Sequence, residues 1–371
     1  MTKKWVNIAD VLFFQEGPGV RNTQYTTSGV KLLNVANLVD GKVDLSKSDR
    51  YISEEEAYGK YRHFLCDDGD FVIASSGIKV EYIDKKMGFV DASMLPLCMN
   101  TSTIRFKVLD ENQLRIRYFM YYLKSKHFKE QLTKQITGSA QLNYGPSHLK
   151  KMIMPLIDIT VQDEIISCMD KLQSIIETRQ RELIELDRLM KARFVELFGD
   201  PRSNPFGFEK KRLKDTCKVI TGNTPSRAIA EYYGDYIEWI KTDNIVSGIL
   251  NPTQATESLS EKGMNVGRTV EKDSILMACI AGSIASIGRV CITDRTVAFN
   301  QQINAVVPEQ YNILFLYVLF QMSKDYLVED INMALKGILS KSKLEEKEFI
   351  IPPMDLQEQF SDFVKQVNKS K

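Results

Sequence analysis

The chain has 371 residues, which is more than one hydrophobic core usually organises, so we expect two domains. Apolar residues make up 43% and charged residues 26%, which excludes a disordered or fibrous chain. Lys and Arg number 49 against 48 Asp and Glu, so the chain is not a polycation that binds any anion through bulk charge. Only residues 1–150 lean basic, with 21 basic and 17 acidic side chains, so any nucleic-acid surface must be local.

The cysteines and the apolar segments indicate the cellular compartment. The six cysteines form no C-x-x-C pair and have no close histidine, which favours free, buried thiols in a reducing cytoplasm over a zinc site or a disulfide framework. They are Cys66, Cys98, Cys168, Cys217, Cys279 and Cys291. The N-terminal segment lacks the apolar region of a signal peptide, and the longest apolar run, Ile313–Phe320, is too short to span a bilayer. We therefore expect a cytoplasmic protein without a membrane partner.

The same order of predicted secondary-structure elements occurs twice along the chain, in a first and a second round. Short β-rich runs bounded by Gly, Asn, Asp or Ser come first, and amphipathic helices follow them. The predicted strand segments are Gly29–Val39 and Asp70–Ala74 in the first round, and Ile237–Ile245 and Arg289–Ile292 in the second. The predicted helices are Gln113–Ile136 and Ile313–Leu335.

The two rounds also resemble each other in sequence. Leu32–Gly41 aligns with Trp239–Gly248 at an offset of 207 residues, in its apolar pattern and in its Asn and Gly. The closing segment Ser147–Glu164 aligns with Ser342–Gln359 at an offset of 195 residues. The middles of the two copies therefore differ in length while their flanks agree. This pattern predicts one scaffold that carries two different surfaces.

A long helix is predicted between the copies. Residues 162–198 contain no Gly or Pro, and apolar residues recur there at alternating steps of four and three. A heptad seam of this length predicts a helix of about 55 Å that packs against another helix, and Gly199 with Pro201 predicts its end. We assign partner docking to eight seam residues: Ile165, Met169, Leu172, Ile176, Leu183, Leu186, Met190 and Leu197.

The corresponding helix of the second copy is short. It begins near Leu356, and Phe360, Val364 and Val367 form its seam over about two heptads. A helix of this length covers only part of the long helix. We therefore expect other chains to cover the rest of the apolar stripe.

No sequence pattern indicates catalysis. The chain has no phosphate-binding G-x-x-x-x-G-K-[ST] loop, no Gly-rich turn for a dinucleotide or a methyl donor, and no N-P-P-[YF] stretch. Glu345-Glu346-Lys347-Glu348 contains the carboxylates and the lysine that a metal-dependent nuclease needs, but this run is more typical of the solvent-exposed start of a helix. The three histidines lie far apart and accompany no nucleophile signature. We therefore assign no catalytic residue, no cofactor and no metal site.

Several loops carry side chains that can contact DNA. Asn and Gln pair with adenine, Arg and Lys with guanine, and Ser and Thr hydroxyls meet phosphate. Clusters of Gly, Asn, Ser and Thr are also ordinary turns, and that alternative stays open for each loop. The candidates are Arg21, Ser75, Ser76, Lys79, Ser139, Gln141, Asn143, Asn223, Thr224, Ser226, Arg227, Lys241, Asn300 and Gln301.

These motifs resemble the specificity (S) subunits of type I restriction–modification systems. The resemblance covers almost the whole chain and depends on the order of the motifs and on the two copies. The motifs are Ile220–Ser226, Trp239–Ile245, Phe299–Ile303, the two closing segments of the repeat, and the end of the long helix with its stop, Arg193–Pro201.

The resemblance implies an α+β fold with two similar target-recognition domains, separated by a long coiled-coil-type helix and followed by a shorter C-terminal helix. Each domain would read one half of a gapped double-stranded DNA site. The helices would bind methyltransferase subunits, two of them, and restriction subunits would join that core, so the chain itself would be non-catalytic. The implied boundaries are 1–158 and 200–353 for the two domains, 159–199 for the central helix and 354–371 for the C-terminal helix.

Two features depart from the family pattern. The second helix ends early, and the near-neutral charge is low for a DNA-binding chain. We therefore predict weak, salt-sensitive DNA binding by the isolated chain, which methyltransferase subunits tighten. The alternatives are a helical protein–protein adaptor, a specificity subunit of a related type II methyltransferase–nuclease system, and a chain that is itself a nuclease or methyltransferase.

Overall fold

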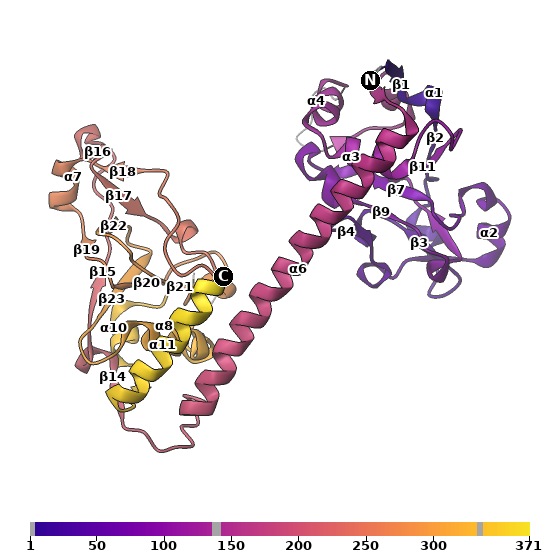
Figure 1. Ribbon diagram of the computed structural model, residues 1–371. Coiled ribbons are helices and arrows are strands. Elements are labelled where there is room, and N and C mark those ends of the chain that lie inside the picture. The colour runs from indigo at the N-terminus through magenta and orange to yellow at the C-terminus, as the bar shows by residue number, and fades with distance from the viewer. Residues whose placement is uncertain (1–3, 136–141, 332–336) are drawn as a thin grey trace. The chain divides into compact units, whose positions relative to one another are not determined.

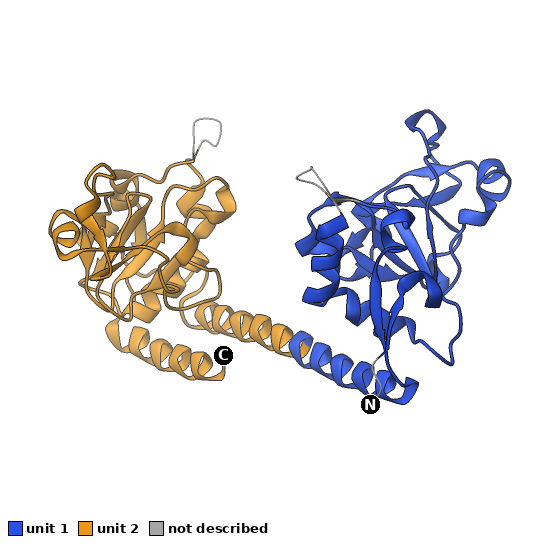
Figure 2. Cartoon of the chain, turned by 90° about the horizontal axis from the view of Figure 1, so that it is seen from above, with its two compact units in different colours: residues 1–177 blue, residues 178–371 orange. Residues whose placement is uncertain are grey.

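The computed structural model describes residues 4–135, 142–331 and 337–371 (Figure 1). The chain divides into two compact units, residues 1–177 and 178–371, which Figure 2 shows in blue and orange. The division falls within helix α6 (Ile159–Phe198), so each unit contains one part of this helix. Each unit combines small sheets with helices, which confirms the α+β fold.

A four-stranded antiparallel sheet forms the core of the first unit. Its order is β2 (Leu12–Glu16), β11 (Thr103–Val108), β7 (Phe71–Ala74) and β9 (Met87–Phe89). All four residues of β7 are buried, as expected for the central part of a sheet covered on both faces. The helices α3 (Ile116–Leu123) and α4 (Lys126–Gln135) cover this core through Phe119, which contacts Phe71, Phe106 and Phe128.

The second unit repeats this sheet. Its order is β15 (Cys217–Thr221), β23 (Ile303–Pro308), β20 (Ile275–Ala278) and β21 (Val290–Ile292), again antiparallel. The helices α8 (Ile313–Met322) and α9 (Lys324–Val328) follow it in the chain, as α3 and α4 follow β11. The repeat in the sequence is therefore a repeat of the fold.

A second sheet in each unit mixes parallel and antiparallel pairs. In the first unit β3 (Val30–Leu33) lies between its parallel partner β10 (Leu97–Met99) and its antiparallel partner β6 (Tyr51–Ile52). In the second unit β17 (Ile237–Ile240) lies between its parallel partner β22 (Val297–Phe299) and its antiparallel partner β18 (Ser258–Leu259). This sheet is extended by β16 (Tyr233–Gly234) and β19 (Thr269–Val270).

A two-stranded pair joins the two ends of each repeat. In the first unit β1 (Lys4–Asn7) pairs with β13 (Ile153–Leu156), and in the second β14 (Lys210–Arg212) pairs with β24 (Glu348–Ile350). Besides short 3-10 turns, the remaining short α-helices and strands are α1 (Ile8–Val11), β4 (Leu38–Val39), β5 (Lys42–Val43), α2 (Glu54–Tyr58), β8 (Ser76–Ile78), β12 (Leu142–Asn143), α5 (Pro146–Leu149), α7 (Glu261–Val266) and α10 (Lys341–Glu346).

The prediction of one continuous helix in each round is wrong. The segment Gln113–Ile136 forms two helices, α3 and α4, because the Ser125 hydroxyl accepts a hydrogen bond from the backbone of Phe128 and starts a second helix. The segment Ile313–Leu335 is interrupted at Ser323, whose backbone is not helical. Ile136 and Leu335 lie outside the described residues.

The predicted strands at Gly29–Val39 and Ile237–Ile245 are also shorter than expected. Each begins with the predicted strand, β3 or β17, and then turns at Asn34 or Lys241. In the first segment the Asn34 side chain accepts a hydrogen bond from the backbone of Ala36, which favours a tight turn over an extended strand.

The long helix α6 has 40 residues and begins at Ile159, three residues before the predicted segment. It ends at Phe198, and Gly199 follows with a φ of +70°, which a glycine adopts without strain. The C-terminal helix α11 (Met354–Ser370) buries its predicted seam, and Phe360 packs on Phe194 of α6, with ring centres 5.5 Å apart.

The middle of the apolar stripe of α6 is exposed. Met190 is buried, whereas Ile165, Met169, Leu186 and Leu197 are half-buried. All residues from 171 to 185 are exposed. The three seam residues there are between 41% and 51% exposed: Leu172, Ile176 and Leu183. This middle part of the stripe thus lacks a covering element among the described residues.

The prediction that all cysteines are buried is wrong for one of them. Cys168 on α6 is exposed, whereas the other five thiols are buried, and burial raises the pKa of the Cys66 thiol. Among the described residues, no helix is long and apolar enough to cross a membrane. The same ranges contain no group of three His, Cys, Asp or Glu side chains placed to hold a metal ion.

Candidate nucleic-acid interface

Several candidate residues of the second unit gather around the indole of Trp239, which lies on β17 and is 3% exposed. The Arg227 guanidinium lies 5.2 Å from the Trp239 ring centre and 4.4 Å from that of Tyr233. The Lys241 ammonium lies 5.1 Å from the same indole. Cations at these distances are attracted by the ring faces, so both side chains are held beside the aromatic pair.

Glu257 connects the two cations. Its Oε2 accepts from Arg227 at 2.6 Å, and its Oε1 accepts from Lys241. The hydrogen bonds from Lys241 and Arg227 lower the pKa of Glu257, so the carboxylate stays ionised. The Arg227 side chain is 56% exposed and that of Glu257 is 37% exposed. We call Arg227, Trp239, Lys241 and Glu257 the Trp239 cluster.

Two further loops adjoin this cluster. The Thr224 hydroxyl donates to Gln301 Oε1, and Asn223 O accepts from the Trp239 indole at 3.3 Å. These contacts need a close backbone approach, because a Cβ at Gly222 would lie 2.2 Å from the carbonyl oxygen of Asn300. The structure thus brings together candidates from residues 222–227, 239–241 and 299–301.

Asn223 and Asn300 have different environments. The Asn223 amide nitrogen donates to Val266 O at 2.8 Å, whereas its Oδ1 is buried and has no partner among the described residues. Asn300 is buried, and its Oδ1 accepts from the backbone of Gln302 at 3.1 Å. Asn300 therefore fixes its loop through its own side chain. Ser226 lies exposed on the loop that carries Arg227.

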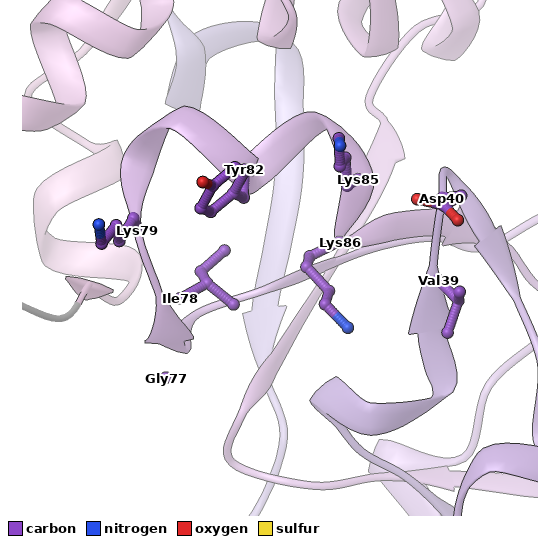
Figure 3. A pocket seen from close by; sticks show the side chains of 8 residues that line it. All are labelled: Val39, Asp40, Gly77, Ile78, Lys79, Tyr82, Lys85 and Lys86. Atoms are coloured by element: carbon purple, nitrogen blue, oxygen red, sulfur yellow. The ribbon is translucent and has the colours of Figure 1, made fainter. Parts of the chain in front are cut away.

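In the first unit, Lys79 lies at a basic hollow (Figure 3). This surface cavity of about 600 Å³ is lined by Val39, Asp40, Gly77, Ile78, Lys79, Tyr82, Lys85 and Lys86. Lys79 is exposed and pairs with Glu81 at 3.7 Å, a surface pair of little strength. Lys85 and Lys86 are not among the sequence candidates, although two adjacent lysines are visible in the sequence.

The other first-unit candidates are more scattered. Arg21 is exposed, whereas Ser75 is fully buried and its hydroxyl donates to Thr101 O at 3.0 Å. Ser76 is half-buried, and its strand β8 pairs with β12, where Asn143 lies opposite Ser76. Ser139 and Gln141 lie outside the described residues.

Glu257 is likewise not among the sequence candidates. This residue is 30 positions from Arg227 and 16 from Lys241, so no local pattern connects them. The 207-residue offset of the repeat aligns Glu257 with Arg50, so the repeat marks the position but not its charge. The Trp239 N–H donates to Glu257 O, as the Leu32 N–H donates to Arg50 O, so Glu257 and Arg50 are equivalent.

Comparisons with known proteins agree with this repeat. A family model described as "Type I restriction modification DNA specificity domain" matches residues 18–188 and again residues 205–371. The HindI specificity subunit of Haemophilus influenzae is 33% identical over 146 residues, which are 38% of this chain and 31% of that relative. The MjaIX specificity subunit of Methanocaldococcus jannaschii is 24% identical over 75% of this chain and 68% of its own length.

Solved structures support the fold. An S subunit from M. genitalium superposes with a TM-score of 0.57 at 14% identity, covering 100% of this chain and 90% of that one. A chain from a structure of a type I R-M system gives 0.55 at 15% identity, covering 99% and 90%. Because the family model matches both repeats and nearly all of the chain, this protein belongs to the family of type I restriction–modification DNA specificity subunits.

Proposed function

We propose that this chain reads the two halves of a gapped, double-stranded DNA site, one with each target-recognition domain, and is itself non-catalytic. The observation that carries the proposal is the Trp239 cluster with its neighbouring loops. Three segments distant in sequence present an exposed Arg, a Lys, a Thr and a Gln beside one aromatic pair. Such groups read base edges and hold phosphates.

The proposed roles follow the environment of each side chain. In the second domain, Arg227 and Lys241 would contact guanine or phosphate, and Asn223, Thr224, Ser226 and Gln301 would contact base edges or phosphate. Asn300 is buried and would position the loop that carries Gln301.

In the first domain, Lys79 would meet phosphates together with Lys85 and Lys86 around the hollow of Figure 3. Ser75 is buried and would hold the end of β7 for the loop that follows. The remaining proposed contacts of this domain are Arg21, Ser76, Ser139, Gln141 and Asn143.

The proposal includes partners. The exposed apolar stripe of α6 would bind methyltransferase subunits, two per chain, because such a stripe is otherwise exposed to water. Restriction subunits would join that core, and the complex would work on DNA in the cytoplasm without a cofactor held by this chain. The proposed boundaries are 1–158 and 200–353 for the domains and 159–199 and 354–371 for the helices.

Methylation mapping tests the function. DNA from cells that carry this chain with its partner subunits should be methylated at one bipartite motif, and exchanging residues 1–158 for those of a relative should change one half of that motif. If replacing the loops at 222–227 and 299–301 leaves the motif unchanged, the protein is an adaptor without DNA reading. Methyl transfer by the chain alone would contradict a non-catalytic role.

A further inference from the structure

The two domains carry opposite charges at one equivalent position. In each, a backbone N–H of the central strand of the mixed sheet donates to the carbonyl of the residue just before the antiparallel partner strand. Leu32 N donates to Arg50 O at 2.8 Å, and Trp239 N donates to Glu257 O at 3.1 Å. Arg50 is exposed beside the Tyr25 ring, with 5.3 Å between its guanidinium carbon and the ring centre. Glu257 instead binds two cations.

Stability alone does not explain the acidic residue. Arg227 and Glu257 are exposed to a degree at which ion pairs contribute little to folding. Arg227 is also held by the Tyr233 and Trp239 rings, and Lys241 by the Trp239 ring, so both cations stay at this surface without the carboxylate. What the carboxylate changes is the local charge, because it engages both cations in hydrogen bonds.

We propose that Glu257 is a specificity-determining residue: it holds Arg227 and Lys241 away from the phosphates of non-target DNA and so lowers the affinity of the second domain for DNA in general. This inference rests on the proposed function, in which the Trp239 cluster meets DNA. Binding to any duplex grows with the number of phosphates that cations neutralise, whereas specificity is the ratio between target and non-target affinity. A carboxylate that competes with phosphates for the two cations lowers the affinity for non-target DNA most. At the target, contacts to the bases compensate for the weakened phosphate contacts.

The test is a salt titration of the full chain with a pool of random-sequence duplex. Freeing two cations should steepen the slope of log affinity against log salt by about 1.8, at about 0.9 per neutralised phosphate. We therefore expect Glu257→Gln to bind the pool more tightly at low salt and with a slope steeper by about that amount. Glu257→Ser serves as a second variant, and circular dichroism verifies that each variant is folded.

The second unit contains a matched control. Glu346 also joins one Lys and one Arg: its Oε1 lies 2.5 Å from Lys214, and its Oε2 lies 3.6 Å from Arg212. This trio lies at β14, at the 3-10 turn Leu213–Asp215 that follows it and at α10, and these two labelled elements are away from β17 and β18 (Figure 1). Glu346→Gln removes the same charge and should leave the slope unchanged.

The outcomes separate the inference from the proposed function. If Glu257→Gln and Glu346→Gln give equal slopes, or if Glu257→Gln does not bind the pool, the inference is overturned. The tighter binding and the steeper slope of Glu257→Gln should vanish when Arg227→Gln and Lys241→Gln are added to it. If they persist in the triple variant, the inference is also overturned. The proposed function fails instead if exchanging the second domain leaves the methylated motif unchanged.

Discussion

Each compact unit buries one glutamine at the same place in the repeat, Gln162 in the first and Gln357 in the second. Gln162 lies near the start of α6. Its Oε1 accepts from the backbone of Arg115 at 2.9 Å, and its Nε2 donates to the carbonyls of Gln113 and Ile157, both at 2.8 Å. One side chain thus connects the start of α6 to the start of α3 and to the end of β13.

Gln357 repeats this role at the start of α11. Its Oε1 accepts from the backbone of Asn312 at 2.9 Å, and its Nε2 donates to Pro352 O at 2.8 Å. Replacing each glutamine by leucine keeps the volume and removes the hydrogen bonds. A buried polar group left without a partner costs about 1–3 kcal/mol. Gln162→Leu leaves three backbone groups without a partner, so at the lower value its free energy of unfolding falls by about 3 kcal/mol. Gln357→Leu leaves two such groups, and its free energy of unfolding falls by about 2 kcal/mol.

Hydrogen exchange of the full chain, followed by mass spectrometry over a series of urea concentrations, measures the free energy of unfolding of each unit separately. Gln162→Leu should lower the free energy of unfolding of residues 4–135 and leave the second unit unchanged, and Gln357→Leu should do the reverse. Gln173→Leu on the exposed middle of α6 is the matched control, because the exposed side chain of Gln173 donates to Glu177 on the surface. Equal stabilities of Gln162→Leu and Gln173→Leu would refute the reasoning.

Three further predictions concern packing, pH and thiol reactivity. Phe360→Ala should destabilise the second unit by about 3–5 kcal/mol in the same experiment, because it empties the aromatic cluster between α11 and α6, whereas Phe206→Ala on the surface should have little effect. A hydrogen bond from Arg295 lowers the pKa of Glu238 in the folded state, so this carboxylate stabilises the fold above the ordinary carboxyl pKa and loses that effect as pH falls through its lower folded-state pKa. In thermal unfolding measured over a range of acidic pH, Glu238→Gln should therefore weaken the fall of the melting temperature with falling pH. An unchanged fall would contradict the assignment. Cys168 should be the only one of the six cysteines to react rapidly with an aromatic disulfide reagent in the native protein, and Cys168→Ser should abolish that fast phase in an absorbance trace.

Local patterns in the sequence predicted much of the fold. The heptad spacing predicted α6 to within three residues at its start, and Gly199 marked its end, because helix periodicity and caps involve only neighbouring residues. The repeat predicted two equivalent units, since the same segments recur in the same order. The breaks at Ser125 and Ser323 were missed because apolar periodicity continues across both.

The candidate interface depended much more on tertiary structure. Ser75 and Asn300 look like surface polar residues in the sequence, yet both are buried: the Ser75 hydroxyl donates to Thr101 O, and the Asn300 side chain accepts from the backbone of Gln302. The sequence by itself determined the two copies, the long helix and the kinds of side chain in the loops, all of which follow from local spacing. Only the tertiary structure placed Glu257 between Arg227 and Lys241, because the pairing of β17 with β18 joins residues that no local pattern connects.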